Sequence, residues 1–304
     1  MSGLLVVGDV VTDIVARYRT PLTPATDTPA EIRRLPGGAG ANVACWAARS
    51  GGRPVRLLGR VGTDEADWHD DALRRAGVRP TLVPDAEVGT ATVISLVDAS
   101  AERTFLTDSG AALRLTPDDW ADTFLAGTAH LHLSGYLFFA DASRAAALRA
   151  VRGAQEAGVP VSVDPASVGF LVRLGVDRFL AAARHVAMLF PNADEARALT
   201  GRADPAEAAE TLSRTFPLVA VTLGAEGALV AEAGALTGRV PAPDVRPVDS
   251  TGAGDAFTGA FLAARLAGAD ALEAAEAGCR AGAEAVTVVG GRPPSARGGA
   301  RERG

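Results

Sequence analysis

Small residues and a carboxylate stand together in the run DSTGAGDAFTGAF at positions 249–261. Glycines let backbone N–H groups approach a phosphate without a Cβ in the way, and the unpaired N–H groups of a first helical turn favour negative charge. The amides of Gly252, Ala253 and Gly254, followed by Asp255 as a base for an attacking hydroxyl, indicate phosphoryl transfer. The alternative is a glycine-rich turn in which Asp255 only favours the positive end of a helix.

A second group of residues suits the recognition of an acceptor. Asp9 and Asp13 follow the first apolar segment of the chain, and a carboxylate can accept hydrogen bonds from two neighbouring hydroxyls. Gly37, Gly38 and Asn42 precede or open a helix. The glycines would let a ligand approach the backbone closely, and the Asn42 side-chain amide could both donate and accept hydrogen bonds. The alternatives are solvated loop aspartates and a glycine turn with a helix-capping Asn. Asn42 lies two residues inside the turn rather than at its edge, which favours ligand contact.

Two further motifs point to a nucleotide. Asn192 and Glu195 follow an apolar segment, and their spacing of three places both on one side of a first helical turn. There they could order waters around Mg²⁺, or Glu195 could simply stand at a favourable helix position. Thr222, Gly224 and Gly227 form a turn that could pass close to a nucleotide or could merely connect two strands.

These motifs together resemble a known family. The run at 249–261 is similar to the C-terminal signature of the ribokinase-like, or PfkB, carbohydrate kinases, and GGAGANVA at 37–44 resembles their N-terminal signature. PNADE at 191–195 is similar to the Asn-x-x-Glu motif of the family, and TLGAEG at 222–227 to its nucleotide-binding turn. The resemblance covers nearly the whole chain. Ala39 departs from ribokinases proper, which carry a Lys there, and this weakens an assignment to ribose.

The resemblance implies several roles. It makes Asp13 a sugar-binding residue, and it implies ATP and Mg²⁺ as cofactors, with Glu195 acting on the metal through water. Asp249, Thr251 and Gly290 resemble a monovalent-cation site of the family, which would take K⁺. A small β lid would close over the sugar, exclude water and serve in a homodimer. Arg103, on that lid, is either solvated or in contact with an acidic or phosphorylated sugar.

The expected elements alternate between strands and helices, which predicts a three-layer α/β/α fold with a mostly parallel sheet in a single domain, 1–304. Two segments, about 14–36 and 88–110, break the alternation and are expected to form the lid, with an antiparallel hairpin over 90–97 and 103–107. The tail 296–304 is expected to be frayed. Predicted strands are 3–8, 55–61, 129–134, 159–163, 186–190 and 218–223, and predicted helices are 41–50, 66–76, 141–157, 194–200, 204–215, 253–267 and 270–286.

Composition narrows the function classes. The 304 residues are 48% hydrophobic and 22% charged, with a net charge of −6, which argues against nucleic-acid and anionic-membrane partners. The first residues lack the basic start and apolar segment of a signal peptide, and no apolar run is long enough to span a membrane, so a cytoplasmic location is expected. All 30 basic residues are Arg, so Schiff-base chemistry and a Walker-type Lys are excluded, and a nucleotide must be held by backbone amides and Arg. Cys45 and Cys279 fit buried thiols, and His130 and His132 fit buried histidines better than a metal pair.

The sequence therefore predicts ATP-dependent phosphorylation of a primary hydroxyl on a small sugar or sugar derivative. A nucleoside kinase of the same fold is the first alternative. It would stack a base on aromatic rings, yet aromatics are 5% of the chain and the lid offers mainly Tyr18 and Phe105. A non-catalytic sugar- or nucleotide-binding regulator is the second alternative, and the intact Asp255 argues against it.

Overall fold

The structure is a computed structural model that describes residues 2–99 and 103–294. The tail for which fraying was expected, 296–304, lies outside these residues. None of the described helices is long and apolar enough to span a membrane.

Nine strands form the central sheet: β1 (Gly3–Val7), β4 (Val55–Gly62), β5 (Val78–Asp85), β8 (Thr128–Ser134), β9 (Val161–Asp164), β10 (Met188–Leu189), β11 (Leu218–Thr222), β12 (Ala228–Glu232) and β13 (Ala235–Val240). Their order is β13-β12-β11-β10-β9-β8-β1-β4-β5. All neighbouring pairs are parallel except the two that involve β12. The predicted mostly parallel sheet is confirmed, and its parallel strands bring their carboxyl ends to one edge.

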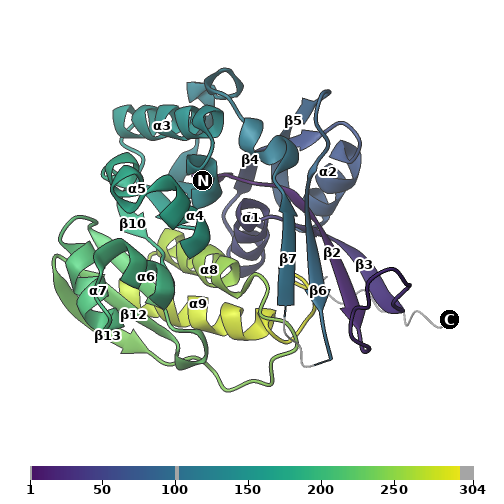
Figure 1. Ribbon diagram of the computed structural model, residues 1–304. Helices are drawn as coiled ribbons and strands as arrows, with labels where there is room; N and C mark the ends of the chain where they lie inside the picture. Colours follow the sequence, from purple (N-terminus) through teal and green to yellow (C-terminus); the bar gives the residue numbers. More distant parts are fainter. Residues whose placement is uncertain (1, 100–102, 295–304) are drawn as a thin grey trace.

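Helices cover both faces of this sheet (Figure 1). They are α1 (Ala39–Ser50), α2 (Ala66–Arg75), α3 (Asp141–Glu156), α4 (Val168–Leu174), α5 (Val176–Ala183), α6 (Ala193–Thr200), α7 (Pro205–Ser213), α8 (Ala253–Ala267) and α9 (Ala271–Ala285). Alternate residues of β1 explain the two layers, because successive strand side chains point to opposite faces. Leu4 and Val6 join the core with α1, α8 and α9, whereas Leu5 and Val7 join the core with α3, α5, α6 and α7.

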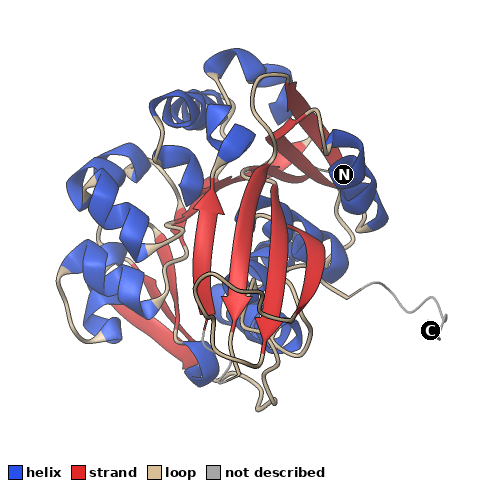
Figure 2. Cartoon of the chain, turned by 45° about the vertical axis from the view of Figure 1, so that its right-hand side comes forward, coloured by secondary structure: helices blue, strands red, loops and turns tan. Residues whose placement is uncertain are grey.

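A separate four-stranded sheet, the lid sheet, lies beside the main body (Figure 2). It comprises β2 (Val11–Tyr18), β3 (Ala30–Gly37), β6 (Ala91–Val97) and β7 (Arg103–Asp108), in the order β3-β2-β6-β7. The expected antiparallel hairpin of β6 and β7 is present, and β2 and β3 form a second one. The two hairpins join through a parallel pairing of β2 with β6.

Several elements had no counterpart among the predictions. β5 is an edge strand that contains Pro80 and Pro84, and β13 is a mostly exposed edge strand. Edge strands carry polar residues and proline and therefore lack the apolar run that marks a buried strand. α4 and α5 have 7 and 8 residues and meet at Gly175, whose φ is 94°, so neither offers a long periodic pattern.

Candidate active site

A cleft of about 480 Å³ lies between the lid sheet and the main body. Val11, Asp13, Val93, Phe105 and Thr107 enter it from the lid sheet. The main body contributes residues that follow β1, β8 and β9 together with the first turns of α1 and α8, among them Asp9, Gly38, Ala39, Asn42, Tyr136, Asp164, Phe170, Thr251 and Asp255. The predicted acceptor residues Asp9, Asp13, Gly38 and Asn42 therefore come together at one opening. We call it the acceptor cleft.

Asp9 is buried, and its carboxylate already has partners within the chain. Oδ2 accepts a hydrogen bond from the Ala39 amide at 2.7 Å, and Oδ1 accepts from the Gly40 amide at 3.2 Å and from Ser134 Oγ at 2.7 Å. Asp9 thereby satisfies amides at the start of α1, which would otherwise lack partners. In this structure it anchors the glycine turn to β1 and β8.

Asp13 lies directly against that turn. A Cβ on Gly37 would sit 2.0 Å from Asp13 Oδ2, so only glycine fits beside the carboxylate. Gly38 precedes α1 with a φ of 95°, a left-handed conformation that favours glycine. Burial, and secondarily the charge of Asp9, raise the pKa of Asp13 to about 7.

Asn42 and Asp255 meet at the base of the cleft. Asn42 Nδ2 donates a hydrogen bond to Asp255 Oδ2 at 2.8 Å, and Asn42 Oδ1 is buried without a partner among the described residues. Burial raises the pKa of Asp255 well above its usual range, and the hydrogen bond from Asn42 acts in the opposite direction. A raised pKa makes the Asp255 carboxylate a stronger proton acceptor than an ordinary aspartate.

A smaller cavity of about 140 Å³ adjoins the cleft at the start of α8. We call it the phosphoryl cavity, and it is lined by Gly252, Ala253, Gly254 and Asp255. A Cβ on Gly254 would meet no atom within 4 Å, so this residue borders open space. The Ala253 amide already donates to the Ser250 carbonyl at 3.4 Å. Of the three predicted amides, that of Ala253 is thus partly engaged, through a long hydrogen bond.

Asn192 and Glu195 line the same cavity and cap α6 reciprocally. Asn192 Oδ1 accepts from the Glu195 amide, and Glu195 Oε2 accepts from the Asn192 amide, both at 2.9 Å. This is a capping box. Burial, and next the charge of Asp164, raise the pKa of Glu195 to about 8. Asn192 and Glu195 therefore both cap the start of α6 and line the phosphoryl cavity.

A third cavity of about 530 Å³ extends from there between the turn at 222–227 and helices α8 and α9. Thr222, Gly224 and Gly227 line it, as the sequence predicts, and the turn also connects β11 and β12. Gly227 has a φ of 95°, and a Cβ there would lie 1.9 Å from the Val240 carbonyl oxygen. We call this the nucleotide pocket. Its described lining contains no Arg, but Arg239 lines a neighbouring cavity that shares Asn192, Thr222 and Gly224 with this pocket.

Asp249, Thr251 and Gly290 lie together beside the start of α8. Asp249 Oδ1 accepts from the Thr251 amide at 2.8 Å, and Oδ2 accepts from the Gly290 amide at 3.0 Å. The predicted monovalent-cation residues are thus neighbours, linked by the Asp249 carboxylate. Within residues 2–99 and 103–294, no group of three or more His, Cys, Asp or Glu side chains could hold a metal ion.

Arg103 and the histidine pair complete the predicted set. Arg103 opens β7 opposite Val97, at the far end of the strand from Asp108, which lines the acceptor cleft. His130 Nε2 and His132 Nδ1 lie 2.8 and 2.9 Å from Ser162 Oγ, and both rings are buried. They are core histidines, as predicted. Cys45 and Cys279 are free buried thiols.

Sequence reasoning missed Asp164 and two aromatic side chains. Asp164 ends β9 and lines both the acceptor cleft and the phosphoryl cavity, as Asp255 does. Its signal was an acidic residue at the end of an apolar strand, the same pattern that singled out Asp9. Tyr136 and Phe170 line the cleft from the main body with ring centroids 5.3 Å apart. The cleft is therefore more aromatic than the lid residues alone suggested.

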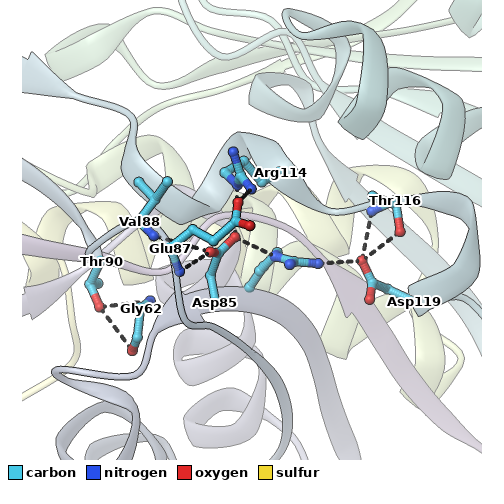
Figure 3. A network of polar contacts seen from close by, with 9 residues as sticks. Gly62, Asp85, Glu87, Val88, Thr90, Arg114, Thr116 and Asp119 are labelled. Carbon is cyan, nitrogen blue, oxygen red and sulfur yellow. Dashed lines mark hydrogen bonds and ion pairs between the residues drawn. The ribbon is translucent and has the colours of Figure 1, made fainter.

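A network of polar contacts, also unpredicted, fixes the lid hairpin to the main body (Figure 3). The buried Asp85 at the end of β5 accepts hydrogen bonds from Arg60 at 3.0 Å and Arg114 at 2.8 Å. Its other oxygen accepts from the amides of Glu87 and Val88 at 3.0 and 3.1 Å. These hydrogen bonds, that of Glu87 first, hold the pKa of Asp85 well below its usual range. Because the segments before β6 and after β7 meet here, both ends of the hairpin are secured.

Comparison with known proteins identifies the family. The model of the pfkB family of carbohydrate kinases matches residues 1–297. The chain belongs to this family. The kinase is 33% identical over 277 residues to a fructokinase of Klebsiella pneumoniae, across 86% of this chain and 84% of the relative. It is a carbohydrate kinase, a phosphotransferase with an alcohol group as acceptor.

Solved structures share the fold of the kinase. An adenosine kinase from Sinorhizobium meliloti superimposes with a TM-score of 0.86 at 27% identity, covering 96% of both chains. A candidate ribokinase II from E. coli, solved with ATP and Mg²⁺, gives a TM-score of 0.85 at 25% identity over 98% of this chain and 96% of that one. The ribokinase-like fold with a lid sheet, predicted from the sequence, is confirmed.

Proposed function

We propose that the kinase transfers a phosphoryl group from ATP to a primary hydroxyl of a small sugar, with Asp255 as the general base. The observation that carries this proposal is the place of Asp255, which lines both the acceptor cleft and the phosphoryl cavity. A hydroxyl bound in the cleft would therefore lie next to Asp255, its base, and next to the phosphoryl group held in the adjoining cavity. Holding both in one place supplies much of the catalysis of phosphoryl transfer.

The acceptor would be held by Asp13 and Asn42, with the backbone of Gly37 and Gly38 close to its ring. Asp13 faces the cleft from β2 and Asn42 lines it from the first turn of α1, and a carboxylate and a side-chain amide can both hydrogen-bond hydroxyls. Asn42 Nδ2 also keeps the Asp255 carboxylate directed into the cleft. As the hydroxyl attacks, its proton passes to Asp255, whose raised pKa favours uptake at that moment.

The first turn of α8 would stabilise the transferring group. Gly252 and Gly254 line the phosphoryl cavity and would direct their amides to it, and Ala253, whose amide makes a long hydrogen bond to the Ser250 carbonyl, would add a weaker donor. Backbone donors fixed at a helix start stabilise the charge of a phosphoryl group without reorganisation.

Mg²⁺ would bind where Asn192, Glu195 and Asp164 face the phosphoryl cavity. Their oxygen atoms suit a hard cation that keeps part of its hydration shell, and the E. coli neighbour solved with ATP and Mg²⁺ supports the use of these two cofactors. When bound, the ion supplies positive charge to the phosphates. Thr222, Gly224 and Gly227 would hold the nucleotide in the adjoining pocket.

K⁺ would order the loop at 249–254 by binding beside Asp249, Thr251 and Gly290. The clustering of these residues next to the phosphoryl cavity supports this proposal. Replacing K⁺ with a bulky organic cation at matched ionic strength should lower turnover. Equal rates with both cations would refute it.

A homodimer would form through the outer face of the lid sheet. That face carries Ile32 and Leu106, which are 67% and 55% exposed, and exposed apolar groups favour burial against a partner. Sedimentation of the full chain and of Ile32→Glu should show a dimer and a monomer, respectively, and a monomeric wild type would refute the proposal. The cytoplasmic location stays a prediction.

A nucleoside is the second candidate acceptor, because Tyr136 and Phe170 line the cleft opposite Phe105 of the lid sheet. Aromatic faces can stack on a base, and the adenosine kinase from S. meliloti shares the fold. The test is ATP consumption with D-fructose, D-ribose, sugar phosphates, deoxy-keto acids and adenosine as separate acceptors. Turnover with a sugar alone supports the first candidate, turnover with adenosine alone the second, and ATP consumption with none of them refutes both.

A further inference from the structure

The segment Gly290–Arg292, which follows α9, contacts the acceptor side and the phosphoryl side of the site at once. The Gly290 amide donates to Asp249 Oδ2, and the Gly291 carbonyl accepts from Trp46 Nε1 at 2.9 Å. A Cβ on Gly291 would lie 2.3 Å from Asn42 Nδ2, and a Cβ on Gly252 would lie 2.5 Å from Gly291 Cα. The segment is therefore packed between Asn42 and the start of α8.

Arg292 ends this segment behind the glycine turn of the acceptor cleft. Its Nη2 donates to the Gly37 carbonyl at 3.3 Å, and its Nε and Nη1 are buried without hydrogen-bond partners among the described residues. Burying a guanidinium in this way is unfavourable unless nearby charge compensates for it.

The acceptor cleft supplies that compensating charge. Its described lining includes the five carboxylates Asp9, Asp13, Asp108, Asp164 and Asp255 and no basic residue. Gly37 links Arg292 to Asp13. Its carbonyl oxygen accepts the hydrogen bond from the Arg292 guanidinium, and its Cα packs against the Asp13 carboxylate. Only Gly37 therefore separates Arg292 from Asp13, the carboxylate that faces the acceptor cleft.

We propose that Arg292 is a positioning residue for the acceptor site: it fixes the Gly37 carbonyl and balances the charge of Asp13, so that Asp13 stays in place to accept hydroxyl hydrogen bonds. This inference rests on the proposed function, in which Asp13 binds the acceptor. Charged groups around Asp13 include Asp9 and Asp249, which oppose its ionisation, and Arg292, which favours it. His69 is buried, and burial lowers its pKa to about 3, so it carries no charge near neutral pH.

Steady-state kinetics with D-fructose as the probe tests the positioning role. Arg292→Gln should raise the KM for D-fructose about tenfold, the effect of weakening one charge-assisted hydrogen bond, and leave the KM for ATP within about twofold. Arg292→Lys restores the charge and should return the KM for D-fructose most of the way. Arg280→Gln, which removes an exposed Arg of α9, is the matched control and should change neither constant. A joint rise of both constants in Arg292→Gln, or no rescue by Lys, would overturn the inference.

A stability comparison tests the charge balance without any acceptor. Urea unfolding of the full chain at about pH 8, where Asp13 is mostly ionised, would be measured for wild type, Arg292→Gln, Asp13→Asn and the double variant. The loss caused by Arg292→Gln should be larger with Asp13 present than with Asn at 13, and equal losses would refute the inference. If Arg292→Gln alone fails to fold, folding of the double variant supports the charge balance, and its failure overturns it.

The two measurements also separate this inference from the proposed function. If the wild-type protein phosphorylates none of the tested acceptors, the proposed function fails, while the stability comparison still decides whether Arg292 balances Asp13.

Discussion

Asn42 Nδ2 lies 2.8 Å from Asp255 Oδ2, although 213 positions separate the two residues in the chain. The hydrogen bond joins the first turns of α1 and α8, the two helices that carry the N-terminal and C-terminal signatures of the family. In the proposed function, this hydrogen bond would connect recognition of the acceptor with removal of its proton. Asn42 also lines the acceptor cleft, so in the proposed function the same side chain would contact both the base and the acceptor.

Asn42→Ala should move the acid limb of the pH profile of kcat to higher pH. The Asn42 hydrogen bond favours the ionised form of Asp255 and lowers its pKa, so its loss raises that pKa and leaves less base at low pH. The variant should therefore lose more activity at the acid end of the profile than at its alkaline end, measured by ATP consumption at saturating acceptor. An unchanged profile shape with a uniform loss would contradict the role in ionisation.

Asp13→Ala should raise the KM for the sugar and leave the KM for ATP unchanged. An acceptor hydroxyl left without its partner costs about 1–3 kcal/mol, which corresponds to about tenfold or more in affinity. Asp108→Ala, which removes another carboxylate that lines the cleft from the lid sheet, is a suitable comparison. A weaker affinity for ATP with unchanged sugar binding would show that the acceptor side is misassigned.

The protein without nucleotide should lose stability as the pH rises above about 6.5. Burial raises the pKa of Asp13 to about 7 and that of Glu195 to about 8, both above their unfolded values. The folded state then holds protons that the unfolded state has released, so stability present at low pH is lost as the pH passes through these values. Buried His69, His130 and His132 have lowered pKa values and act oppositely, but only below their ordinary value of 6.5.

Glu195→Gln keeps the capping geometry of α6 and should flatten this loss, as followed by urea unfolding at about pH 6.5 and about pH 8.5. Asp194→Asn changes an exposed residue of the same helical turn and should leave the pH dependence intact. The same slope in Glu195→Gln as in wild type would exclude Glu195 as its source.

Gly224 and Gly227 offer a matched pair at the nucleotide pocket. Both have positive φ, but a Cβ on Gly224 meets open space whereas one on Gly227 would lie 1.9 Å from the Val240 carbonyl oxygen. Gly224→Ala should therefore cost only the left-handed backbone, about 1–2 kcal/mol of unfolding free energy. Gly227→Ala should cost more and weaken ATP binding, as measured by urea unfolding and nucleotide titration. Equal costs would mean that the turn moves away from Val240.

The sequence predicted the central parallel strands and the motifs at their ends well, because apolar runs and glycine-rich turns leave local signals. It could not predict that the Asp9 carboxylate accepts hydrogen bonds from Ala39, Gly40 and Ser134, since these contacts join β1 to α1 and β8. The Asp85 network and Arg292 were invisible for the same reason. Their roles depend on segments that only the tertiary structure brings together.

The low aromatic content led to the wrong expectation that few rings would line the acceptor cleft, for a different reason. A low overall fraction says nothing about where the few rings lie, and Tyr136 and Phe170 both lie at the acceptor cleft. Tyr18, expected as a lid contribution, lines a separate cavity under the far part of the lid sheet. Position, rather than number, decides what a site can stack against.

The measurement that tests the central claim most directly is ³¹P NMR of the products formed from ATP and each acceptor by wild type and by Asp255→Asn. The account predicts ADP and a phosphate monoester of a sugar in equal amounts with wild type. It predicts that turnover falls about 10²–10⁴-fold in Asp255→Asn while ATP still binds, because the variant keeps its shape but cannot accept the proton. Full turnover in Asp255→Asn, or ATP hydrolysis by wild type without any phosphorylated acceptor, would contradict it.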